Sequence, residues 1–299
     1  MQRRLLPLTI GLSLALFIQV ASAELVTKTV DLENVDRIKL RGNHQLYLTQ
    51  GGQEYVKVTA SRKVMAKVIA KVSGNTVTLK TEGNYWGLFG FNRHARFDVQ
   101  LQDLRALSAD GSGDITVGRL EVGDIDIENS GSGNLIFGDI SADDIEISLT
   151  GSGDASTGAI AAEEFTLSAS GSADIKLDRL TIADEVELDI AGSGNIEIDA
   201  LDADQVEVDI AGSGKIAVKD SGEADKIEVR IAGSGGFEAP NLRGSEVTVD
   251  ISGSGNVAIS AHRTLEVTIM GSGDVHYSGD PVVESNVYGS GDIRQVSTH

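Results

Sequence analysis

The 299-residue chain contains no cysteine, so disulfide bonds, thiolate chemistry and cysteine-ligated metal sites are excluded. Proline contributes 3 residues, and aromatic residues make up 4% of the chain. Basic residues are also scarce, because 25 Lys and Arg stand against 45 Asp and Glu, which gives a net charge of −20. A chain this acidic argues against nucleic acid and against anionic lipid headgroups as partners. Its stability has to come from burial and backbone pairing.

The first residues have the features of an export signal. Arg3 and Arg4 precede an apolar stretch from Leu5 to Val20, and Ala21-Ser22-Ala23 matches a signal-peptidase site. We expect residues 1–23 to be removed, which leaves a protein of the periplasm, the cell surface or the extracellular medium. An uncleaved anchor is the alternative, although the stretch is short for a membrane span. The sequence has no second hydrophobic segment, so the mature chain is expected to lack a transmembrane segment.

Glycine is abundant and periodic. A Gly-Ser-Gly type signature recurs ten times at steps of 18 to 21 residues, beginning at Gly111, Gly131, Gly151, Gly171, Gly192, Gly212, Gly233, Gly253, Gly271 and Gly289. A constant step near 20 residues indicates one structural unit stacked on itself.

The pattern within each unit predicts short strands separated by sharp bends. Apolar residues stand six, four and often two positions before the first glycine, as in Val186, Leu188 and Ile190, with mostly polar residues between them. A second strand follows the glycines, as in Ile196 and Ile198. This alternation is typical of half-buried strands, and the spacing leaves no room for a helix in each unit. The sequence therefore predicts an all-β, right-handed parallel β-helix (solenoid) of about 20-residue coils stacked at about 4.8 Å.

The glycine signature fits a tight corner, because glycine adopts positive φ and permits close backbone approach. Eight of the ten copies carry Asp or Asn three positions after the first glycine, and Lys215 and Gly236 are the exceptions. Such side chains bond to nearby backbone in turns, and stacked polar side chains can also bond along a column. The alternative interpretation of this glycine column is a binding edge.

Residues 24–107 lack the signature but contain strand-like stretches, which are residues 37–40, 45–48, 56–59, 76–80 and 97–101. The open end of a β-helix must be covered, and terminal repeats are usually atypical. We expect irregular first coils and a cap over residues 24–107, followed by the regular helix over residues 108–299.

One run of residues carries a family resemblance. The segment Ser108–Ile115 reads SADGSGDI, a spaced leucine pattern leads into it from Leu101, and coils of the type AGSGNIEI follow. Together with the export signal, this resembles the head GIN domain family, labelled "putative auto-transporter adhesin". The resemblance covers nearly the whole mature chain. It implies an exported right-handed β-helix with an adhesive role, and it supplies no catalytic residues.

Acidic residues form columns on the expected outer face. Five positions before the glycine stand Asp126, Glu146, Glu187, Glu207, Glu228, Glu266 and Glu284, and a second column lies two positions further on. One interpretation is a solvated face whose charge prevents sheet aggregation. The other is weak Ca²⁺ binding between Glu187, Asp189, Glu207 and Asp209, because Ca²⁺ prefers several carboxylate oxygens. No other cofactor is expected.

Basic residues interrupt the acidic pattern at Lys215, Lys219, Lys226, Arg230 and Arg243. They either relieve the charge of the columns or mark the cleft of a polysaccharide-active enzyme, which needs acids and bases outside the repeat. The five histidines are dispersed and form no metal-binding pair.

The least periodic stretch runs from residue 85 to residue 96. It holds the one tryptophan of the chain, and its candidate ligand-binding residues are Tyr85, Trp86, Phe89, Phe91 and Arg93. Aromatic rings beside arginine suit sugar stacking, partner contact or a membrane surface. The alternative is a loop that plugs the N-terminal end of the helix.

These features predict an exported envelope or surface protein with a non-enzymatic binding or adhesion role. A glycan or an envelope protein is the expected partner, and the chain is expected to be a monomer or a weak oligomer. The alternatives are a polysaccharide-active β-helix enzyme and a structural protein that assembles end to end.

Overall fold

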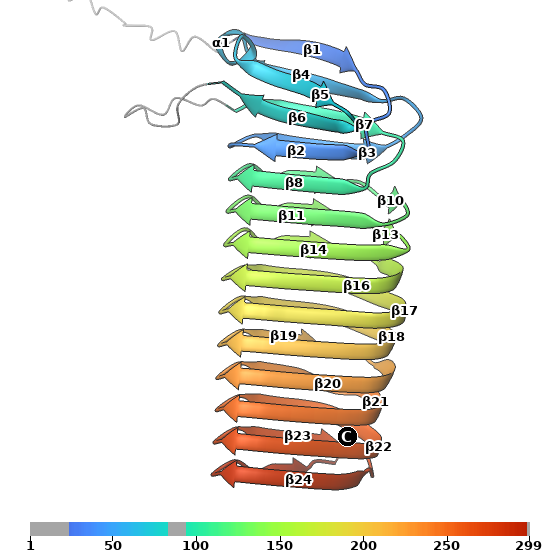
Figure 1. Cartoon of the computed structure of the whole chain (residues 1–299), viewed down its shortest axis with the longest axis vertical. Coiled ribbons are helices and arrows are strands. Elements are labelled where there is room, and N and C mark those ends of the chain that lie inside the picture. Colours follow the sequence, from blue (N-terminus) through green and yellow to red (C-terminus); the bar gives the residue numbers. More distant parts are fainter. Residues whose placement is uncertain (1–23, 83–93, 298–299) are drawn as a thin grey trace, which may run out of the picture.

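The computed structural model describes residues 24–82 and 94–297, and Figure 1 shows them as a single stack of coils. Strands on the front of the stack run in one direction, strands at the back return, and the chain descends as a right-handed solenoid. The predicted parallel β-helix is confirmed.

The regular coils begin at β8 and contain up to three short strands each. The first three coils comprise β8 (Ala106–Gly111), β9 (Ile115–Val117), β10 (Leu120–Glu121), β11 (Ile125–Gly131), β12 (Leu135–Phe137), β13 (Ile140–Ser141), β14 (Asp144–Gly151) and β15 (Ala155–Thr157). Further on, several strands continue through the bend: β16 (Ile160–Gly171), β17 (Asp174–Gly192), β18 (Asn195–Gly212), β19 (Lys215–Val218), β20 (Gly222–Gly233), β21 (Gly236–Gly253), β22 (Asn256–Gly271), β23 (Asp274–Ser278), β24 (Val282–Gly289) and β25 (Ile293–Gln295).

Equivalent residues of successive coils lie opposite one another. Val186 pairs in register with Val206, which pairs with Ile227 and then, through β21, with Val247. These side chains point inward and are at most 2% exposed. Phe165 and Phe237, both fully buried, fill the interior of their coils. The columns predicted from the 20-residue step are therefore confirmed, and burial of this continuous apolar interior stabilises the stack.

The glycine corners are as tight as the signature predicts. The first glycine of all ten copies has a φ between +127° and +157°, which side-chain-bearing residues rarely adopt. From the second copy onward, the serine that follows donates its backbone N–H to the corresponding glycine carbonyl of the previous coil, as Ser132 does to Gly111 at 3.0 Å. A Cβ atom added to Gly131 would lie 1.9 Å from the carbonyl oxygen of Gly111, so the corners stack too closely for any side chain.

The Asp and Asn column forms a ladder along the stack. The backbone N–H of Asn134 donates to Oδ1 of Asp114 at 3.1 Å, and Asp154 and Asp174 continue the ladder at 3.0 Å. The same bond joins Asp292 to Asp274 near the C-terminal end. These side chains thus bond to the next coil.

Residues 24–82 and 94–105 form β1 (Leu25–Asp31), β2 (Arg37–Arg41), β3 (Gln45–Gln50), β4 (Tyr55–Ser61), α1 (Arg62–Met65), β5 (Val68–Ser73), β6 (Thr76–Thr81) and β7 (Arg96–Leu101). The five strand-like stretches of the sequence correspond to β2, β3, β4, β6 and β7. Their spatial order departs from chain order, because β2 lies between β6 and β8, and β3 lies between β7 and β9. The first coil of the chain is thus enclosed by two later ones.

β1, β4, α1 and β5 form the N-terminal cap, which lies beyond the last parallel coil (Figure 1). β4 pairs antiparallel with β7 and with β1, and β5 pairs antiparallel with β6. Ser61 begins α1 by accepting a hydrogen bond from the backbone N–H of Val64, whose side chain is buried against the core. Within the described residues, no helix has the length and apolarity needed to cross a membrane.

Candidate functional site

The aromatic candidates Tyr85, Trp86, Phe89, Phe91 and Arg93 lie outside the described residues. The strands on either side locate the two ends of their segment. β6 ends at Thr81 and β7 begins at Arg96, and these strands stack directly on β2 and β3. The end of β6 and the start of β7 therefore lie at the same corner of the stack that the glycine signature occupies in later coils.

A hollow of about 840 Å³ opens on this corner. We call it the corner hollow and define it by its lining residues: Arg41, Gly42, Asn43, Lys80, Thr81, Glu82, Asp110, Gly111, Ser112, Gly131, Ser132 and Ser152. They come from five successive coils, so the hollow extends along the solenoid axis. Serine side chains line one stretch of it and charged side chains the other.

The walls of the corner hollow offer hydrogen-bonding groups of every kind. Arg41 and Lys80 bring cations, Glu82 and Asp110 bring carboxylates, and Asn43 brings an amide. Among the described residues, neither Arg41 nor Lys80 has an ion-pair partner. Their charges are therefore available to a bound molecule.

The corner of the first coil was not anticipated from the sequence. Gly42 has a φ of +102° and stacks on Gly111, and His44 stacks on Gly113. Gly42-Asn43-His44 is thus a further corner that has lost its second glycine. A strand ending at Arg41 and followed by Gly-Asn was the available signal.

His44 lies buried behind this corner, with 2% of its surface exposed. Its Nδ1 accepts a hydrogen bond from the backbone N–H of Ala95 at 3.3 Å, and its ring packs edge-on against Phe97. Burial, reinforced by the nearby charge of His94, lowers the pKa of His44 to about 4. The imidazole is therefore neutral at physiological pH and acts as part of the core.

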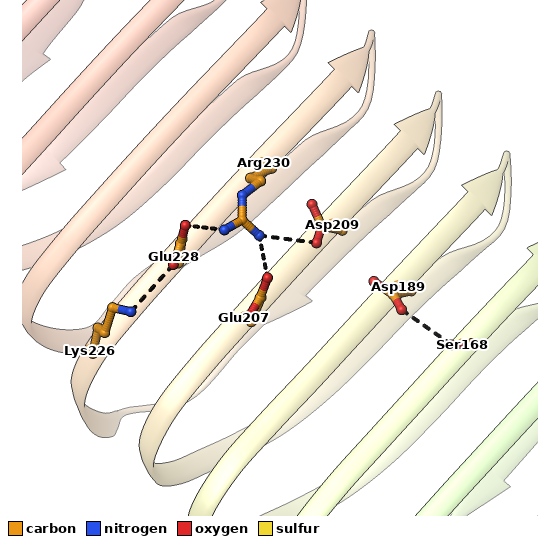
Figure 2. A network of polar contacts seen from close by, with 7 residues as sticks. All are labelled: Ser168, Asp189, Glu207, Asp209, Lys226, Glu228 and Arg230. Atoms are coloured by element: carbon orange, nitrogen blue, oxygen red, sulfur yellow. Dashed lines mark hydrogen bonds and ion pairs between the residues drawn. The ribbon is translucent and has the colours of Figure 1, made fainter.

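The acidic columns lie on the outer face, and Figure 2 shows where a cation interrupts them. Arg230 donates to Glu207 of the previous coil and to Glu228 of its own strand, and it contacts Asp209 at 3.3 Å. Lys226 pairs with Glu228 at 3.4 Å. Hydrogen bonding to Glu207 and the surrounding carboxylates raise the pKa of Arg230, so it stays protonated.

Further along the column, carboxylates of neighbouring coils face each other. Burial, followed by the charges of Asp189 and Glu207, raises the pKa of Glu187. Burial is also the main cause that raises the pKa of Asp189, against a hydrogen bond from Ser168 at 3.3 Å. The coils therefore repel each other at this point of the face.

The calcium hypothesis depends on Glu187, Asp189, Glu207 and Asp209. The register between β17 and β18 places Glu187 beside Glu207 and Asp189 beside Asp209, as the acidic columns of the sequence predict. Arg230 binds two of the four carboxylates. Within the described residues, no group of three or more acidic or histidine side chains is arranged to hold a metal ion. Calcium binding stays a prediction.

The remaining basic interruptions are also paired. Lys215 contacts Glu238 at 2.5 Å, Lys219 pairs with Glu197, and Arg243 lies 3.7 Å from Glu223. These ion pairs support the interpretation that the basic residues relieve the charge of the acidic columns, since each neutralises a carboxylate of a neighbouring coil.

Comparison with known proteins supplies a family match. A family model described as "Putative auto-transporter adhesin, head GIN domain" matches residues 34–200 and 166–281. A solved structure described as a putative adhesin from Parabacteroides distasonis ATCC 8503 is 21% identical with a TM-score of 0.55, and the alignment covers 92% of this chain and 98% of that one. One from Parabacteroides merdae ATCC 43184 is 19% identical with a TM-score of 0.55, covering 91% and 96%. At these identities the likeness shows a shared fold. No curated protein sequence matches the chain.

Proposed function

Because the chain belongs to the head GIN domain family of putative auto-transporter adhesins, we propose that it is an exported envelope or surface protein that binds a glycan at the corner hollow without converting it chemically. The family supports a binding or adhesion role. The export signal in residues 1–23 supports a location outside the cytoplasm.

The observation that carries the ligand class is the lining of the corner hollow. Hydroxyl, amide, guanidinium, ammonium and carboxylate groups come from five coils spaced about 4.8 Å apart. A sugar chain lying along the axis presents a row of hydroxyl groups that both donate and accept hydrogen bonds. The hollow supplies a matching row of donors and acceptors, and Thr81 and Glu82, which precede the aromatic candidates in the sequence, belong to its lining.

The arrangement of the acids supports binding over catalysis. The acids that Figure 2 displays repeat from coil to coil, and several of them pair with Arg230 or Lys226. A glycosidase needs a specific pair of carboxyl groups on either side of the scissile bond, one of them free to protonate it.

The proposal is tested by glycan-array binding of the exported protein, with Arg41→Ala and Lys80→Ala as variants. Lys176→Ala is the matched control, because Lys176 is exposed on β17 and does not line the hollow. Each hollow variant should weaken glycan binding about tenfold, since a charged hydrogen bond is lost. Equal binding by all variants would contradict the site.

Two further arms separate the alternatives. Trp86→Ala tests the aromatic segment independently of the hollow, and unchanged binding would remove that segment from the proposal. Release of reducing ends from any bound polysaccharide would favour the enzyme instead.

A further inference from the structure

The charge of the chain is divided between its two parts. Residues 24–107 contain 13 Lys and Arg against 8 Asp and Glu, whereas residues 108–299 contain 10 against 37. The N-terminal part is therefore net positive and the shaft of regular coils strongly negative. The net charge of the whole chain, which argues against anionic partners, hides this separation.

Part of this positive charge lies exposed on the N-terminal cap. The exposed cations are Lys28 on β1, Arg62 and Lys63 on α1, Lys67 after it, and Lys71 on β5. Among the described residues, only Arg62 of these five forms an ion pair, with Glu24 at 3.0 Å. Lys63, Lys67 and Lys71 follow one another along the segment that joins β4 to β6.

Two apolar side chains accompany these cations. Leu25 is 69% exposed at the end of β1 nearest α1, where it pairs in register with Ser61, and Val72 is 40% exposed beside Lys71. Asp31 lies at the opposite end of β1, in register with Tyr55. Leu25 therefore lies beside the cations of α1, whereas Lys71 and Val72 lie towards the far end of β5. The cap thus carries both cations and exposed apolar groups, two features of interfacial membrane contact.

We propose that the N-terminal cap docks onto an anionic phospholipid surface. Its lysines attract the headgroup phosphates, and Leu25 and Val72 enter the interfacial region. The acidic shaft is repelled by the same surface, so the solenoid stands away from the membrane with its C-terminal coils outermost. Electrostatic attraction of this kind acts within about 8 to 10 Å at physiological salt, so it selects the cap and not the shaft.

The test is sedimentation with vesicles of phosphatidylglycerol and phosphatidylcholine in roughly equal parts. The protein is purified after export from the expressing cell. Mass spectrometry then identifies its N-terminus, because a retained apolar leader would bind vesicles by itself. Wild-type protein should bind these vesicles, should not bind pure phosphatidylcholine, and should dissociate at high salt.

The decisive variant is the triple substitution Lys63→Glu, Lys67→Glu and Lys71→Glu. At about 1 kcal/mol for each basic residue near the surface, affinity should fall about 100-fold or more. The matched control, Arg119→Glu, Lys176→Glu and Arg179→Glu, makes the same charge change on the shaft and should retain binding. Circular dichroism and thermal melting verify that both variants fold.

Three results would overturn the proposal. They are equal loss of vesicle binding in both triple variants, no binding by the wild type to the anionic vesicles, and equally tight binding of soluble polyphosphate. The last result would assign the cations to a free polyanion.

Discussion

The first glycine of each corner is the residue on which the stack depends most. All ten copies keep glycine there, and all ten have positive φ. The third position is less strict, because Ala173 replaces glycine in one copy. The difference has a physical basis, since the first position combines an unfavourable φ for side chains with a steric block, whereas the third presents the block alone.

Gly192→Ala should therefore destabilise the protein by about 3 kcal/mol, since its Cβ would lie 2.3 Å from the carbonyl oxygen of Gly171 at a φ of +141°. Gly194→Ala should cost less, because its Cβ would lie 2.4 Å from the carbonyl oxygen of Ala173 but its φ is not in the positive range. Gly52→Ala, at a position with nothing within 4 Å, is the control and should be near neutral. Urea unfolding measures all three, and equal costs at Gly192 and Gly194 would refute the φ argument.

His44 makes stability depend on pH. Its pKa falls from 6.5 to about 4 on folding, so between these values the unfolded chain binds more protons than the folded one. Stability should therefore be lost as pH drops from about 6.5 towards about 4, by an amount on the order of 3 kcal/mol. The raised carboxyl pKa values of Asp126, Glu187 and Asp189 act in the opposite direction, because protonation relieves first the burial of their charge and then the repulsion from neighbouring carboxylates.

Comparison of wild type with His44→Asn isolates the histidine contribution. The asparagine side chain can still accept a hydrogen bond from the backbone of Ala95, but it does not titrate. The difference in unfolding free energy between the two proteins should shrink as pH is lowered through this window. A difference that stays constant with pH would show that His44 is not the titrating group.

Among the strands, β20 holds the cation that joins two coils of the acidic face. Arg230→Gln leaves Glu207, Asp209 and Glu228 without it, and since the pairs are partly exposed the cost should be about 1 kcal/mol at neutral pH and less in acid. Arg263→Gln, which removes one exposed pair, is the control. If calcium binds this face, it should raise the melting temperature of Arg230→Gln more than that of wild type. Equal calcium shifts in the two proteins would argue against the calcium site.

The regular coils were predictable from the sequence because every coil repeats the same requirement. Val186, Val206 and Ile227 occupy one column since each must bury the same inward position. The order of β2, β6 and β8 was not predictable, because those strands share no repeated signature and their pairing spans tens of residues. The corner hollow could not be predicted for the same reason, because its lining brings Lys80 and Arg41 together with Ser132 from coils that are out of chain order. The ion-pair partners of Arg230 could not be predicted either, because three carboxylates lie within reach of one flexible side chain.

On the scale of the whole molecule, the two ends of the described stack differ. The free edges of β1 and β5 carry Lys28 and Lys71, which discourage strand pairing. β24 pairs with β22 alone within the described chain, and its inward residues Val283 and Val287 are 37% and 41% exposed, against 1% and 0% for Leu265 and Ile269 one coil earlier.

Weak, concentration-dependent self-association through the edge of β24 is therefore expected. Val287→Lys should abolish it, because an inward-pointing charge blocks edge pairing. Val72→Lys at the opposite end is the control and should leave association unchanged. Sedimentation velocity over a range of concentrations measures both, and identical behaviour of the two variants would exclude β24 as the contact.

The enclosure of β2 between β6 and β8 dictates when the molecule can begin to form. A chain that is synthesised with its N-terminus first cannot complete its earliest coil, because β2 pairs with residues 76–79 and 106–110. Nucleation has to wait until both of these segments have emerged and is the slow, long-range step. Every later turn then finds a finished template and adds in sequence, so an interrupted polypeptide that includes residue 117 would already carry a structured tip.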